Sequence, residues 1–122
     1  MKTYRGIRRR NQTKVIVEDT RDYEEVFVEL PQCLDIVNHS PTGFEWGYEG
    51  SGPAQLSFAL LYDVTKDENF SFENYQNYKR DVVSRLDNSD WMLSTKEVEY
   101  WIEHLGRRIN ETINQRRSEL EE

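Results

Sequence analysis

The sequence predicts an α+β fold, in which a small antiparallel sheet comes first and helices follow. Short apolar segments with partial alternation fill the first 37 residues, which is typical of strands. From residue 53 onward apolar residues recur at intervals of three and four, which is typical of helices. Strands grouped before helices favour α+β over alternating α/β architecture. A chain of 122 residues is long enough for one core.

Three strands are expected at 3–7, 14–18 and 25–30, with a hairpin turn at 11–13 between the first two. The polar stretch 19–24 is expected to be a turn, and Pro31 to stop the third strand. The apolar residues of 34–37 suggest a short fourth strand. Strands so close in sequence favour a meander.

A loop is expected over 38–52, because this stretch has neither a helical nor a strand period. Loops of this length are usually functional or packed by their own side chains. Pro53 suits the first turn of a helix, and Ser51 or Gly52 is expected to cap it. Residues 53–65 are apolar nearly all round, so we expect them to form the buried central helix.

Two amphipathic helices are expected after it. The first would be capped by Ser71 and would continue to about residue 86. The second would begin at the capping box formed by Ser94 and Glu97. It either breaks at Gly106 or runs on to about residue 120, with a thin apolar seam suited to self-association. We therefore expect one domain over 1–105, a helical extension over 106–122, and a homo-oligomer formed through that extension.

Charge and cysteine usage restrict the classes of function. The net charge is −7, which disfavours non-specific binding along DNA, because that binding requires attraction to phosphates. Basic residues crowd 1–14, whereas 18–35 is acidic. Cys33 is the single cysteine, and no apolar run approaches the roughly 18 residues of a membrane span. These features favour the cytoplasm and predict no membrane partner.

The glycine-rich turn before the central helix is the first candidate site. Gly50, Ser51 and Gly52 would present backbone N–H groups at a helix N-terminus, which suits a phosphate or carboxylate. The spacing is not that of a nucleotide-hydrolase loop, and Pro53 removes one donor. The alternative is a tight loop that needs glycine for its backbone conformation.

Aromatic and basic residues give two further candidates. Phe44, Trp46 and Tyr48 alternate, so in an extended segment they would share a face that stacks on a planar ligand or caps the core. Arg8 and Arg10 would share a strand face and hold an anion, or the basic run would pair with the acidic segment.

Catalytic and metal chemistry have little support in the sequence. His39 is the one candidate base near the loop, because histidine is the side-chain type that most often serves as a base at neutral pH, although it is more typical of a hydrogen-bonded turn residue. Neither CxxC nor HxxxH occurs, so no metal site, cofactor or catalytic residue is predicted. An enzyme is the least favoured class. The expected ligand-binding residues are Arg8, Arg10, Asn38, His39, Phe44, Trp46, Tyr48, Gly50, Ser51, Gly52 and Gln55.

Four segments carry a resemblance to a known family. They read YRGIRRRNQT, NHSPTGFEWGYEGSGPAQL, YQNYKRDVVSRL and W-x-LS-x-x-E-V-x-x-W. Together they resemble a family of small proteins with a domain of unknown function, found in bacteria, archaea, phages and other mobile elements and marked by FxWGYxGSGPAQL. The resemblance covers about residues 3–105 and implies no activity. It does imply an accessory or anti-defence role in a phage or plasmid, acting in the host cytoplasm.

Two functions from different classes follow as expectations. The first is a non-enzymatic protein that binds a small anionic or nucleotide-like ligand at the glycine-rich aromatic loop. The second is a protein–protein interaction module that inhibits or regulates a host complex through its acidic surface, including Glu24, Glu25 and Glu29.

Overall fold

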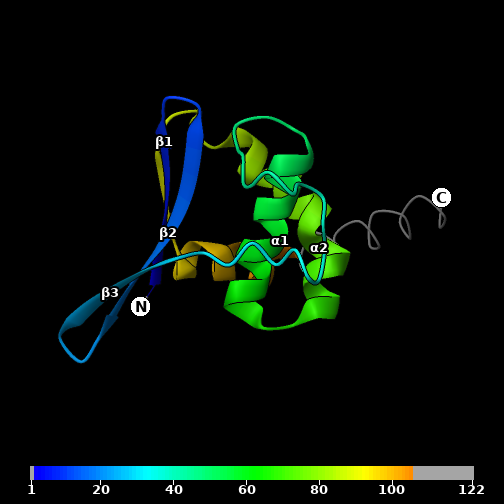
Figure 1. Cartoon of the computed structure of the whole chain (residues 1–122). Coiled ribbons are helices and arrows are strands. Elements are labelled where there is room, and N and C mark those ends of the chain that lie inside the picture. The colour runs from blue at the N-terminus through cyan, green and yellow to red at the C-terminus, as the bar shows by residue number, and fades with distance from the viewer. Residues whose placement is uncertain (1, 106–122) are drawn as a thin grey trace, which may run out of the picture.

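A four-stranded antiparallel sheet, three α-helices and one short 3-10 helix make up the described part of the chain, which is residues 2–105 of this computed structural model (Figure 1). The predicted α+β fold is confirmed. In chain order the elements are β1 (Lys2–Arg9), β2 (Gln12–Arg21), β3 (Glu24–Glu29), α1 (Ser51–Thr65), α2 (Glu68–Asp81), the short 3-10 helix η1 (Val83–Arg85), β4 (Trp91–Ser94) and the helical residues 95–105.

The sheet has the strand order β3-β2-β1-β4, and every pairing is antiparallel. The first turn lies at Arg10 and Asn11, one residue earlier than predicted. The prediction of a turn over 19–24 was wrong in extent, because β2 continues to pair with β3 as far as Arg21 and Glu24. Only Asp22 and Tyr23 form that second turn.

The fourth strand is not where the sequence placed it. Residues 34–36 form a turn, in which the N–H groups of Ile36 and Val37 both donate to the carbonyl of Cys33. The observed β4 lies beyond the helices in sequence and pairs with β1, so that Trp91 lies opposite Gly6. It was missed because four residues give too short an alternation to stand out beside the helix cap that follows.

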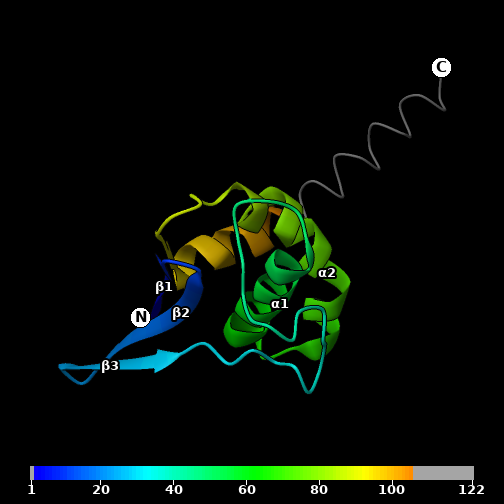
Figure 2. The same ribbon diagram turned by 45° about the horizontal axis from the view of Figure 1, so that its top comes forward.

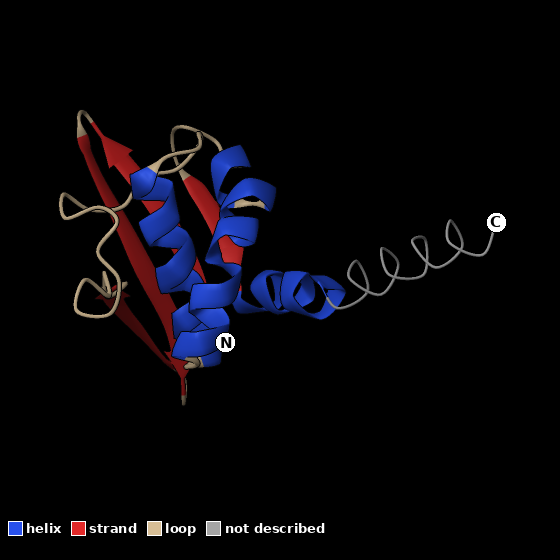
Figure 3. Cartoon of the chain, turned by 90° about the vertical axis from the view of Figure 1, so that its right-hand side faces the viewer, coloured by secondary structure: helices blue, strands red, loops and turns tan. Residues whose placement is uncertain are grey.

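Helices cover one face of the sheet (Figure 3). Val15 and Val17 are buried on this face, whereas Ile16 between them is only partly buried. On the opposite face Phe27 and Met92 are 56% and 58% exposed. None of the described helices packs there. The sheet therefore has one core-facing side and one open side, as a half-buried antiparallel sheet does.

Helix α1 is the centre of the core, as its all-round apolar sequence predicted. Every residue from Gly52 to Leu61 is buried. The helix ends where Lys66 adopts a left-handed conformation (φ 55°) and donates its N–H to the carbonyl of Tyr62 at 2.8 Å. A helix buried on all sides can be held only by layers around it, which here are the sheet, α2 and the preceding loop.

Helix α2 begins earlier than predicted. Asp67 is its N-cap, with Oδ1 accepting from the N–H of Phe70 at 3.0 Å, whereas Ser71 is buried inside the helix. The helix stops at Asp81, before the predicted residue 86, and η1 follows it. The serine half of the second predicted cap is present, since the N–H of Glu97 donates to Ser94 Oγ at 3.2 Å. The predicted extension over 106–122, and self-association through it, lie outside the described residues.

A partly buried ionic contact joins β1 to the end of α1. Tyr4 donates its hydroxyl to Asp63 at 2.6 Å, and Lys2 Nζ lies 3.3 Å from the same carboxylate. Burial alone would raise the pKa of Asp63, but the hydrogen bond from Tyr4 and the charges of Lys2 and Lys66 outweigh it and lower that pKa below its usual value. Burial and the Asp63 contact raise the pKa of Tyr4, which therefore stays protonated.

Candidate functional site

The chain that enters the glycine-rich aromatic loop is held against α1 by the buried side chain of Gln55. Its Nε2 donates to the carbonyls of Gln32 (2.6 Å) and Val37 (2.8 Å), and its Oε1 accepts from the N–H of His39 at 2.8 Å. Gln55 is fully buried, so these bonds hold the chain before the loop against the helix. Gln55 was predicted to contact a ligand, but its amide is already occupied by the backbone. Neighbouring Asn38 is exposed.

His39 packs against α2. Its ring stacks on Tyr75 with the ring centroids 5.0 Å apart, and its Nε2 is buried with no hydrogen-bond partner among the described residues. A ring packed in this way contributes apolar contact to the core edge. No carboxylate in the described part of the chain orients it as a general base would require.

The three alternating aromatics do not share one open face. Phe44 and Trp46 are buried, and Trp46 makes an edge-to-face contact with Trp91 at 5.5 Å and donates its Nε1 proton to the carbonyl of Ser89. Only Tyr48 is open, with 51% of its surface exposed. The burial of Phe44 and Trp46 favours the alternative in which they cap the core, and of the three rings that of Tyr48 is the most exposed.

Arg8 is committed to contacts within the protein. Its guanidinium makes two bonds to Glu45 (2.6 and 3.2 Å), donates Nε–H to the carbonyl of Asn88 at 2.7 Å, and lies 5.0 Å from the Trp46 ring centroid. The hydrogen bond to Glu45 raises the pKa of Arg8. Arg10 lies in the β1–β2 turn (φ 57°), so the prediction that Arg8 and Arg10 share a strand face is wrong.

The glycines of the loop allow close packing. A Cβ on Gly52 would lie 2.6 Å from the Cβ of Glu45, so the loop could not rest on the first turn of α1 if residue 52 had a side chain. Gly47 has φ +83° and donates its N–H to the carbonyl of Val83. The helix begins after Gly50, which is its N-cap in an extended conformation, and Ser51 is exposed. These contacts support the packing alternative for the glycine-rich turn.

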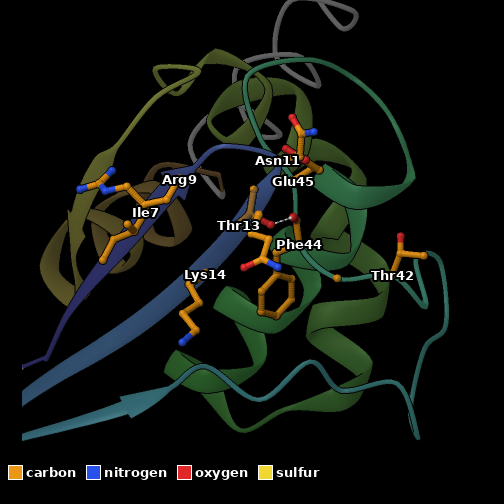
Figure 4. A pocket seen from close by; sticks show the side chains of 10 residues that line it. Ile7, Arg9, Asn11, Thr13, Lys14, Thr42, Phe44 and Glu45 are labelled. Carbon is orange, nitrogen blue, oxygen red and sulfur yellow. Dashed lines mark hydrogen bonds between the residues drawn. The ribbon is translucent and has the colours of Figure 1, made fainter.

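A cavity of about 550 Å³ lies between the β1–β2 turn and residues 42–45 (Figure 4). Thr13 and Phe44 both line it, and the Thr13 hydroxyl donates to the carbonyl of Phe44 at 2.6 Å. Two cations line it, but Arg9 pairs with Asp90 and Lys14 with Glu29. Of the predicted site residues, only Phe44 lines this cavity.

A shallower depression of about 380 Å³ contains Tyr48 together with Glu49, Arg80, Ser84 and Arg85. It combines the one open aromatic ring of the loop with two arginines from α2 and η1. The sequence did not identify these arginines, since they lie on the polar side of a predicted amphipathic helix and look like ordinary surface charge.

Strand β3 is the most exposed element of the described fold. All six of its residues are exposed, including Val26 (42%), Phe27 (56%) and Val28 (52%). Of the described residues, none forms an ion pair with Glu24 or Glu25, and Glu29 pairs with Lys14 at 3.5 Å. We call β3 with its turn residues Asp22 and Tyr23 the acidic hairpin. The sequence predicted an acidic surface that includes Glu24, Glu25 and Glu29. It did not predict that the apolar side chains between these glutamates are exposed.

Metal chemistry and membrane insertion find no support in the described residues. Within residues 2–105, His, Cys, Asp and Glu side chains do not gather in a set of three that could hold a metal ion. No helix in that range is long and apolar enough to cross a membrane.

The fold and loop define a small α+β protein whose glycine-rich aromatic segment is packed onto a buried helix. The chain belongs to a family of unknown function, DUF6166, whose family model matches residues 4–104. No curated protein and no solved structure matches the chain.

Proposed function

We propose that this protein is a non-enzymatic binding protein that recognises another protein through the acidic hairpin. The observation that carries this proposal is the exposure of β3 along its whole length, with three consecutive apolar side chains between glutamates. Exposed apolar patches on small proteins mark interaction sites, and an open edge strand is a ready template for another chain.

The position of the hairpin supports the proposal. Its turn lies well away from the helices (Figures 1 and 2), so a partner can reach it without meeting the rest of the fold. At the turn both Asp22 and Tyr23 have positive φ (48° and 69°), and Tyr23 is fully exposed. Asparagine and glycine suit such positions better than a bulky residue. A tyrosine kept there at a conformational cost is consistent with a ring that contacts a partner.

The loop supports this assignment by what its residues already do. The polar side-chain groups of Gln55, Trp46 and Arg8 are hydrogen-bonded within the protein, and Glu45 packs over Gly52. A ligand would have to displace these contacts. The glycine-rich aromatic loop therefore stabilises the fold, and a partner is recognised by the exposed acidic hairpin.

A second candidate function is binding of a small anionic or nucleotide-like ligand, without turnover, in the depression beside Tyr48. An exposed aromatic ring next to Arg80 and Arg85 favours it, because this pairing suits a planar anion. Exposed Ser51 and the cavity beside Phe44 are two further places where such a ligand could bind.

The biological setting is part of the proposal. The resemblance to proteins of phages and mobile elements supports an anti-defence or accessory role, with a host protein as the partner. Unpaired Cys33 is compatible with the reducing cytoplasm in which that partner would be met.

Crosslinked capture from host cells tests the assignment with two matched variants. We expect E24K/E25K/E29K to lose the partner and Y48A/S51A to keep it, since only the first changes the acidic hairpin. Both variants alter exposed side chains and should fold normally, which circular dichroism checks. Loss of the partner in Y48A/S51A alone would refute recognition through the hairpin.

A further inference from the structure

The backbone groups of β3 are divided between its neighbour β2 and open solvent. The N–H of Leu30 donates to the carbonyl of Val15 at 2.9 Å, just beyond the last residue of the strand. In an antiparallel ladder, bonding to one neighbour recurs at every second residue. Val28 and Val26 therefore bond to β2, whereas Glu25, Phe27 and Glu29 turn their N–H and C=O groups to the open side.

We propose that the open edge of β3 accepts an extended strand from its partner, in which Lys or Arg residues flank an apolar centre. This inference rests on the proposed function and names the mode and chemistry of recognition. Main-chain bonds to Glu25, Phe27 and Glu29 supply the affinity, and side-chain pairs across the new ladder supply the selectivity.

The charge pattern of β3 selects a basic partner. On one face Phe27 lies between Glu25 and Glu29, and on the other Val26 and Val28 follow Glu24. An added strand therefore meets acid, apolar and acid on the first face. Glu24 and Glu25 have no ion-pair partner among the described residues, so Lys or Arg side chains opposite them gain attraction without first breaking a contact.

The same pattern disfavours a second copy of this chain. The fullest antiparallel pairing of two β3 strands is centred on Phe27. That register places Glu25 of each copy opposite Glu29 of the other, twice over, and like charges directly opposite each other are destabilising. A partner with basic residues at these positions removes the conflict.

A synthetic probe follows from the register. The peptide acetyl-Lys-Val-Tyr-Val-Lys-Lys-amide, laid antiparallel from Glu29 to Glu24, places lysine opposite each glutamate and apolar residues opposite Val28, Phe27 and Val26. Amide hydrogen exchange of the full-length protein, followed by NMR, reads the mode directly. We expect the peptide to slow exchange at Glu25, Phe27 and Glu29 and to leave the already bonded Val26 and Val28 unchanged.

A pair of variants at one position separates backbone bonding from charge. Glu25→Gln and Glu25→Pro both remove the carboxylate, but only the proline removes the outward N–H, and edge strands tolerate proline there. We expect Glu25→Gln to weaken peptide binding by up to about fivefold, the range of one cross-strand pair. Glu25→Pro should abolish measurable binding. Circular dichroism shows whether each variant folds. If a variant does not fold, the hydrogen-exchange measurement on the unaltered protein still tests the proposal.

Three results would overturn strand addition. They are unchanged exchange at Glu25, Phe27 and Glu29 under saturating peptide, equal binding of a control peptide with glutamates in place of lysines, and protection that rises with protein concentration alone. The last would mean that the edge pairs with a second copy. If the peptide fails while hairpin-dependent partner capture persists, strand addition is wrong and the proposed function stands. If both fail, both are wrong.

Discussion

Replacing Gln55 by methionine tests whether one buried amide holds the loop in place. Methionine keeps the length and shape of the side chain but leaves three backbone groups without their partner. The carbonyl of Val37 is buried and should cost about 2 kcal/mol, while the groups of Gln32 and His39 are reached by water and should cost about 0.5–1 kcal/mol each. We expect the free energy of unfolding to fall by about 3–4 kcal/mol in total.

Urea unfolding monitored by tryptophan fluorescence measures this loss, because Trp46 is buried within the loop. Ser57→Ala is the matched control. Ser57 is also fully buried on α1, but its hydroxyl only bonds back to the carbonyl of Pro53 one turn earlier. We expect Ser57→Ala to cost less than about 1 kcal/mol. Equal losses in Gln55→Met and Ser57→Ala would refute the role assigned to Gln55.

Three further predictions concern packing, pH and assembly. Gly6→Ala should destabilise by about 1–3 kcal/mol in urea unfolding, because the new Cβ would lie 2.0 Å from Trp91 Nε1; an unchanged midpoint would contradict this. Asp63 has a lowered pKa in the folded protein, so its contribution to stability is present above its unfolded pKa and is lost as pH falls through the folded pKa. Unfolding free energy measured between pH 6 and 2 should therefore fall less steeply in Asp63→Asn. Ile109 and Ile113 belong to the apolar seam of the C-terminal segment. Self-association through this segment predicts that I109E/I113E sediments as a smaller species than the unaltered chain, and identical sedimentation of the two would refute it.

Strongly patterned elements could be predicted from the sequence. Helix α1 could be predicted because its sequence is apolar nearly all round and leaves no polar face. Strand β3 could be predicted because apolar residues 26–28 are followed by Pro31, which stops a strand. The fourth strand could not, since Trp91–Ser94 depends on pairing with a strand 85 or more residues earlier in the chain. Local alternation contains no information about so distant a partner, and the apolar 34–37 segment was mistaken for the missing strand.

The candidate site shows a different limit. Glycines, aromatics and arginines in one segment suit a ligand and a tightly packed loop equally well, and residue types alone do not separate the two. The contacts in the structure distinguish a packed loop from a ligand site. Glu45 packs against Gly52, the Arg8 guanidinium bonds to Glu45, and Trp46 is buried. Arg80 and Arg85 could be joined to Tyr48 only by the fold, because no spacing in the sequence links them.

Native mass spectrometry of the protein purified from cells without denaturation tests the central claim most directly, because it detects a protein partner and a small ligand in the same spectrum. We predict a complex with a second protein that is lost in E24K/E25K/E29K and kept in Y48A/S51A. A bound molecule of small mass that is lost in Y48A/S51A, with no protein partner in any spectrum, would contradict recognition through the acidic hairpin and assign function to the loop.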